Sequence, residues 1–171
     1  AGVERLGQPF DPLVVREPCR VSDGDAWVEA LPPVHPGLSV EYELDYGSGP
    51  IGRQRLALRI TPESYRTELA RARTFVTVEE AARLRAAGLA AHVTHRDLLV
   101  FDADGPVDNQ LRWPDECVRH KVLDLVGDLA LVGRPVHAHV RASRSGHWLN
   151  ATLAARLRNQ IAVSAGRRAS A

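Results

Sequence analysis

Two stretches of the chain alternate between large apolar residues and polar or small ones. In residues 40–46 every second position is apolar, and residues 55–60 repeat the pattern after a glycine-rich break. A period of two is typical of half-buried antiparallel strands. Shorter apolar runs at residues 13–15 and 26–30 predict two further strands. We therefore expect a strand meander over about residues 12–60.

The middle of the chain has the pattern of a β-α-β unit. Residues 73–76 are β-forming, and Thr77, followed by two glutamates, opens a helix that ends before Gly88. Residues 97–101 then form an apolar run typical of a buried strand. The unit covers about residues 73–101.

Helix start and stop signals lie on both sides of this unit. Residues 61–63, Thr-Pro-Glu, predict a short helix, and the longest predicted helix runs from about residue 114 to residue 132. A strand over residues 136–140 leads to a last helix at about 147–160. The residues from 164 to 171 are expected to be a tail.

Composition excludes several classes of protein. The chain has 171 residues, 44% hydrophobic and 25% charged, and its 22 basic side chains are balanced by 21 acidic ones. This suits a globular domain and argues against an arginine-rich RNA-binding protein, so we expect no nucleic-acid partner. No apolar run is long enough to span a membrane or act as a signal peptide, and a cytoplasmic protein is expected.

The chain has two cysteines, Cys19 and Cys117. Two are too few for a disulfide scaffold, and both are expected to be free thiols.

Two residue types are almost or wholly missing. The chain has no methionine, not even at position 1, which suggests a fragment. Lys121 is the sole lysine among 22 basic residues. Because a lysine amine is a compact point charge with a tunable pKa, Lys121 is a candidate for a role that arginine cannot fill. The alternative is a surface lysine retained by chance.

Polar side chains follow one stripe of the longest predicted helix. His120, Asp124 and Asp128 are spaced four residues apart, and Lys121 points about 100° round the same helix. The neighbouring residues are apolar, so these side chains are expected to be buried and to need partners or a metal ion. Histidine and aspartate one turn apart can ligate zinc, but a hydrogen-bonded helix face explains the same spacing.

A further histidine, His147, follows Ser145-Gly146 at the start of the last helix. A glycine at this point lets a backbone or ligand approach closely. His137 and His139 share one face of a predicted strand and could bind a metal ion or simply lie exposed.

These motifs together resemble a known family. Residues 115–129 read DECVRHKVLDLVGDL, Ser145-Gly146-His147 follows, and residues 72–75 read ARTF. In this order they resemble the second half of UDP-3-O-acyl-N-acetylglucosamine deacetylase, the zinc-dependent amidohydrolase of lipid A biosynthesis. The resemblance covers nearly the whole chain.

The resemblance implies zinc-dependent hydrolysis of the N-acetyl group of UDP-3-O-acyl-N-acetylglucosamine. By analogy, His120 and Asp124 are two of the three protein ligands of Zn²⁺. His147 is the general acid that protonates the leaving amine, and Asp128 orients and charges it. These roles make physical sense, because zinc polarises the acetamide carbonyl and acidifies the attacking water.

Further substrate contacts are implied in the same way. Lys121 and Thr74 would contact the oxyanion and the substrate, and a cationic lysine would stabilise the negative charge that builds on oxygen. Side chains between Phe75 and Phe101 would line a hydrophobic passage for the acyl chain. Arg16 matches a position that helps to hold the diphosphate.

The fold implied is an α+β domain, a two-layer sandwich of a mainly antiparallel sheet with helices on one face and the β-α-β insert. In the family this is the second of two similar domains, here residues 1–163. The third zinc ligand, a histidine, and the general-base glutamate belong to the first domain, which this sequence lacks. We therefore expect the chain to be inactive alone and to need that domain in cis or in trans. A non-catalytic module that binds the sugar nucleotide or acyl chain is the alternative.

Overall fold

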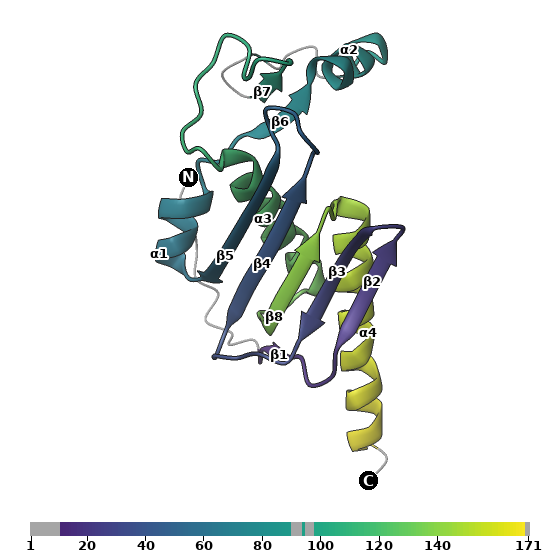
Figure 1. Ribbon diagram of the computed structural model, residues 1–171. Helices are drawn as coiled ribbons and strands as arrows, with labels where there is room; N and C mark the ends of the chain where they lie inside the picture. The colour runs from purple at the N-terminus through teal and green to yellow at the C-terminus, as the bar shows by residue number, and fades with distance from the viewer. Residues whose placement is uncertain (1–10, 90–93, 95–97, 170–171) are drawn as a thin grey trace, which may run out of the picture.

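The computed structural model describes residues 11–89, 94 and 98–169, and within them the chain forms one main sheet with helices behind it (Figure 1). Strands of this sheet follow the order β2-β3-β8-β4-β5, and β1 pairs with β8. The strands are β1 (Leu13–Val14), β2 (Cys19–Asp23), β3 (Ala26–Leu31), β4 (Leu38–Asp45), β5 (Arg53–Ile60) and β8 (Val136–Ser143).

The expected meander is wrong in its pairing, because β8 lies between β3 and β4. β8 runs antiparallel to β3 and parallel to β4. Residues 32–36 between β3 and β4 include three prolines, which cannot donate to a strand ladder or form a tight hairpin there. The sequence analysis also did not predict β2 as a separate strand. It forms a hairpin with β3 around Gly24, whose φ of 53° suits glycine.

The expected two-layer architecture is confirmed, because both long helices cover the same face of the sheet (Figure 1). Alternate residues of each strand point toward them, as the period of two requires. The core is formed by these sheet residues and by apolar positions of α3 and α4: Val28, Ala30, Val40, Tyr42, Leu44, Ala138, Val140, Ala142, Val118, Val122, Leu125, Leu149, Leu153 and Leu157.

The helices mostly match the sequence prediction. The short helix is α1 (Pro62–Ser64), continued by a π-helical turn (Tyr65–Leu69). α3 (Glu116–Leu129) begins two residues later than expected and ends in a 3₁₀ turn, η2 (Ala130–Val132). α4 (His147–Ala169) is longer than expected, so the predicted tail is helical up to residue 169. Residues 161–169 contain no proline to stop it.

The predicted β-α-β insert is also confirmed. β6 (Thr74–Thr77) pairs in parallel with β7 (Leu98–Phe101), and α2 (Val78–Ala86) follows β6. The insert lies beyond the turn that joins β4 and β5 (Figure 1). Residues 90–93 and 95–97, which belong to the expected acyl passage, lie outside the described residues. In the part of the chain that the structure covers, no helix combines the length and apolar character needed to cross a membrane.

Candidate active site

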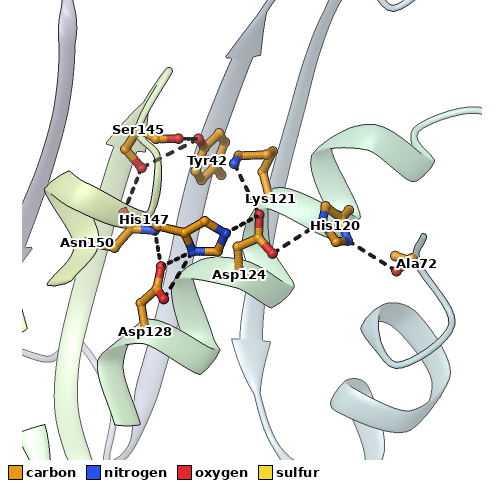
Figure 2. A network of polar contacts seen from close by, with 9 residues as sticks. All are labelled: Tyr42, Ala72, His120, Lys121, Asp124, Asp128, Ser145, His147 and Asn150. Carbon is orange, nitrogen blue, oxygen red and sulfur yellow. Dashed lines mark hydrogen bonds and ion pairs between the residues drawn. The ribbon is translucent and has the colours of Figure 1, made fainter. Parts of the chain in front are cut away.

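The polar stripe of α3 faces the beginning of α4 (Figure 2). His120, Asp124 and Asp128 lie on successive turns, as their spacing predicts. His120 Nε2 is 3.2 Å from Asp124 Oδ1, and both side chains are largely buried. The remaining apolar residues of α3 pack on the sheet, so the helix presents these three polar groups together at one place.

His120 is fixed from both sides of its ring. Nδ1 lies 3.3 Å from the backbone oxygen of Ala72, and the ring stands edge-on to Phe75 with centroids 6.2 Å apart. Burial lowers the pKa of His120, against the opposing effect of the Asp124 carboxylate. A carbonyl oxygen can only accept a hydrogen bond, so a bond to it would need the ring proton on Nδ1. The Asp124 carboxylate offers a competing acceptor to the other ring nitrogen, Nε2.

His147 approaches the same site from the first turn of α4. Its Nδ1 lies 2.9 Å and 3.1 Å from the two carboxylate oxygens of Asp128. Its Nε2 is 4.0 Å from Asp124 Oδ2, so that nitrogen faces the His120 side of the site. The side chain is 71% exposed, so it is accessible to a substrate. The structure thus brings Asp128 and His147 together. The role of Asp128 in orienting and charging a general acid stays a prediction.

A buried chain of hydrogen bonds behind Asp128 was not predicted. Asn150 Nδ2 donates to Asp128 Oδ2 at 2.9 Å, and Ser145 Oγ donates to Asn150 Oδ1 at 2.9 Å. The hydroxyl of Tyr42, on β4, donates to the backbone oxygen of Ser145. Burial raises the pKa of Tyr42 to about 12, so it stays protonated and can donate. The only sequence signal was that Ser145 belongs to the Ser145-Gly146-His147 motif.

Lys121 also reaches the site. Its Nζ lies 3.1 Å from Asp124 Oδ2, across one turn of α3, and most of the side chain is buried. The sole lysine of the chain therefore lies beside the histidine and aspartate pair. Its predicted contact with the oxyanion stays a prediction.

The side chains of the remaining predicted residues, Phe75, Thr74 and Arg16, form no hydrogen bond or ion pair with the described residues of this centre. Phe75 is buried in β6 between His120 and Tyr46. Thr74 is exposed at the start of β6, two residues after Ala72, and Arg16 is exposed between β1 and β2. The described residues offer no hydrogen-bond or ion-pair partner to the side chain of either. Their predicted substrate contacts therefore stay predictions.

A second ion pair, also missed by sequence reasoning, anchors the beginning of α3. Arg73 donates from Nε to Glu116 Oε1 at 2.8 Å and from Nη1 to Asn109 Oδ1 at 2.8 Å. The backbone nitrogens of Arg73 and Arg112 donate to the same carboxylate. Burial raises the pKa of Glu116, but these hydrogen bonds outweigh it and the pKa lies below its usual value. This cluster fixes the chain just before β6 to α3.

His120 and Asp124 fit two positions of a zinc site. An imidazole nitrogen and a carboxylate oxygen are both zinc ligands, and a backbone carbonyl on the other ring nitrogen is the usual partner of a metal-binding histidine. No group of three or more histidine, cysteine, aspartate or glutamate side chains suited to a metal ion occurs among the described residues. Zinc bound here would need further ligands from elsewhere.

Comparison with known proteins agrees with the sequence motifs. The profile of the family described as UDP-3-O-acyl N-acetylglycosamine deacetylase (LpxC) matches residues 1–159. The chain belongs to this family. A UDP-3-O-acyl-N-acetylglucosamine deacetylase from Solibacter usitatus is 40% identical over 158 residues, which are 92% of this chain and 52% of that protein. The enzyme of the same name from Leptospira biflexa is 35% identical over 161 residues, covering 94% and 53%.

Similarity is higher over a shorter region in another member. The UDP-3-O-acyl-N-acetylglucosamine deacetylase of Chlamydia abortus is 47% identical over 118 residues, 68% of this chain and 42% of that protein. The chain thus spans about half the length of the curated deacetylases that it matches.

Proposed function

We propose that this chain supplies two zinc ligands and the general acid for deacetylation of UDP-3-O-acyl-N-acetylglucosamine, the lipid A precursor. The observation that carries the proposal is that the His120–Asp124 pair and the His147–Asp128 pair converge, with His147 Nε2 4.0 Å from Asp124 Oδ2. A pair of metal ligands beside an oriented, exposed histidine would provide some of the groups that hydrolysis of an amide needs. The family membership supports the same reaction.

His120 Nε2 and the Asp124 carboxylate would hold the metal ion. When bound, Zn²⁺ would polarise the acetamide carbonyl and lower the pKa of the attacking water. Burial keeps His120 neutral, which a ligand must be. The Ala72 carbonyl keeps the ring orientation fixed.

His147 would protonate the leaving nitrogen. Water adds to the acetamide carbon, the C–N bond breaks, and the nitrogen departs with a proton from His147 Nε2 as a free amine beside acetate. Asp128 would accept a hydrogen bond from Nδ1–H, so only Nε2 is free to move a proton toward substrate. Positioning of this kind is what makes a general acid effective.

The remaining predicted residues would act on the substrate. Lys121 would stabilise negative charge on the carbonyl oxygen, because its ammonium already lies at Asp124. Thr74 and Phe75 would contact the substrate from the insert, and Arg16 would bind the diphosphate. Phe75 is well placed for this, because its ring touches His120.

We further propose that the family's first domain, in cis or in trans, completes the site. The relatives are about twice as long as this chain, and the described residues hold no third ligand. Apolar side chains are exposed on the helical layer next to the site: Trp148 is 66% exposed and Leu131 is 58% exposed. Such residues suit burial under another domain. The family's first domain would bring the third ligand and the base that takes the proton from water.

The proposal is tested by reconstitution. The chain is joined to the first half of the Solibacter usitatus deacetylase, and acetate release from UDP-3-O-acyl-N-acetylglucosamine is measured with zinc, with a chelator, and after zinc is restored. We expect zinc-dependent release that His120→Ala and Asp124→Ala abolish. His139→Gln is the matched control, because His139 lies on the sheet face away from the helices.

Two results would contradict the proposal. Activity that survives both ligand substitutions would remove the zinc role of His120 and Asp124. Binding of the UDP-sugar without acetate release would favour the alternative, a non-catalytic sugar-nucleotide or acyl-binding module.

A further inference from the structure

One peptide group lies between the Glu116 carboxylate and the His120 ring. The backbone N–H of Arg73 donates to Glu116 Oε1 at 3.1 Å, and the carbonyl oxygen of Ala72 lies 3.3 Å from His120 Nδ1. That N–H and that C=O belong to the same planar peptide unit. A charged group at one end and an imidazole at the other are therefore joined through a single conjugated group, which we call the peptide bridge.

The charge at the Glu116 end is held in place. The side chain is fully buried, and Arg73 donates to it from Nε at 2.8 Å and from Nη2 at 3.0 Å. The backbone N–H of Arg112 donates to Oε2 at 2.6 Å. A carboxylate with this many donors stays ionised and cannot turn away from the Arg73 N–H.

Polarisation of the peptide bridge acts on His120. A peptide whose N–H donates to a carboxylate has a more negative carbonyl oxygen, because hydrogen bonds in a chain strengthen one another. The Ala72 oxygen therefore accepts more strongly from Nδ1–H of His120. Since the neutral ring has one proton, a proton held on Nδ1 leaves Nε2 unprotonated.

Asp124 opposes this arrangement in the metal-free chain. Its Oδ1 lies 3.2 Å from His120 Nε2 and would accept a proton placed there. A carboxylate is a stronger acceptor than an ordinary peptide carbonyl. Without help, the ring proton would favour Nε2, the nitrogen that a metal ion needs free of hydrogen.

We propose that Glu116 is a positioning residue that acts through the peptide bridge to hold the His120 proton on Nδ1 and keep Nε2 ready for a divalent cation. The metal part of this proposal rests on the proposed function. The position of the proton does not, because it can be measured without metal.

Two variants separate this role from simple anchoring. Glu116→Gln keeps a hydrogen-bond acceptor at the position but removes the charge. Arg73→Lys disturbs the same ion pair yet keeps both the Glu116 charge and the backbone N–H that donates to it. Asp115→Asn is the matched control, because Asp115 is the neighbouring carboxylate and pairs with Arg119 at 2.7 Å instead.

The first measurement is the protonated nitrogen of His120, read from ¹⁵N shifts of the ring in the metal-free, full 171-residue chain at a pH where the ring is neutral. We expect Nδ1–H in the unchanged chain, in Arg73→Lys and in Asp115→Asn. We expect a shift of the proton to Nε2 in Glu116→Gln. Nε2–H in the unchanged chain, or equal shifts in Glu116→Gln and Arg73→Lys, would overturn the proposal.

The second measurement is zinc affinity, by competition with a chelator, in the chain joined to the first half of the Solibacter usitatus deacetylase, which would supply the further ligands. Loss of an outer partner of a histidine ligand costs about 10- to 100-fold in metal affinity. We expect a loss of that size in Glu116→Gln and less than about threefold in the other two variants. Failure of the joined protein to bind zinc through His120 would count against the proposed function, while the ring proton would still decide the role of Glu116.

Discussion

Asp128 accepts hydrogen bonds from two side chains of α4, and each bond restricts a different movement. The bond to His147 Nδ1 sets the direction of the ring, and the bond from Asn150 Nδ2 fixes the carboxylate itself. Because Asn150 is fully buried and its oxygen accepts from Ser145, it cannot rotate away. The orientation of an exposed histidine thus depends on a buried amide.

We predict that Asn150→Ala weakens both stability and catalysis. Ser145 and Asp128 would each lose a partner, at a cost of about 2 kcal/mol in the free energy of unfolding. The kcat of the reconstituted deacetylase should fall toward the roughly hundredfold loss expected without a general acid, with KM unchanged. Urea unfolding and steady-state kinetics measure the two effects.

Asn159→Ala is the matched control, since Asn159 lies on the same helix but is exposed. It should change the free energy of unfolding by less than about 0.5 kcal/mol. Equal effects of the two substitutions would show that Asn150 has no special role.

Residues of the site could be predicted where a helix supplies their spacing. His120, Asp124 and Asp128 lie together because four residues make about one turn. Asn150 and Tyr42 could not be found this way, since their partners lie 22 and 103 positions away in the sequence. Glu116 was equally hidden, because Arg73 is 43 positions distant.

At the scale of elements, the stability of α2 depends on the hydrogen bonds at its N-terminus more than on packing of its side chains. None of its residues is fully buried. Its N-terminus has a capping box: Thr77 Oγ1 accepts from the Glu80 N–H, and the Glu80 carboxylate accepts from the Thr77 N–H at 2.8 Å. These two bonds satisfy donors that would otherwise be left free at the helix start.

We predict that Thr77→Ala loosens α2 without unfolding the sheet. Loss of an N-cap costs about 1 kcal/mol, so the amides of α2 should exchange with solvent about fivefold faster. Hydrogen exchange measures this directly. Thr77→Ser keeps the hydroxyl and should exchange like the unchanged chain, and faster exchange throughout the sheet would contradict a local role.

The elements of the insert could be predicted from the sequence, whereas the order of strands in the main sheet could not. The difference is that the first depends on local signals and the second on contacts between distant segments. Capping residues and turns near Thr77 and Gly88 are local signals, readable in a short window. The place of β8 between β3 and β4 is set by pairing between segments about 100 residues apart. Alternation shows that each segment is a strand but does not say which strand it joins.

At the scale of the whole molecule, the main sheet presents two unlike faces. One face is covered by α3 and α4, which also carry the site residues and the exposed Trp148 (Figure 1). The other face carries ion pairs across neighbouring strands, such as Arg141 with Glu41 at 3.7 Å. The charged face suits water, so the domain proposed above to complete the site would meet the helical side.

Acid stability of the whole chain should depend on Glu116. Its pKa lies below its usual value in the folded chain, because hydrogen bonds outweigh burial. The ionised form therefore stabilises the fold above the unfolded pKa of about 4.3, and this stability is lost as the pH falls through the lower folded pKa. We predict that Glu116→Gln lowers the free energy of unfolding by about 3 kcal/mol at neutral pH and by progressively less as the pH drops below about 4. Urea unfolding from pH 7 to pH 3 measures the difference.

The control is Glu63→Gln, at an exposed position, whose free energy of unfolding should follow that of the unchanged chain at every pH. A difference between Glu116→Gln and the unchanged chain that stays constant with pH would mean that the charge of Glu116 contributes nothing to folding.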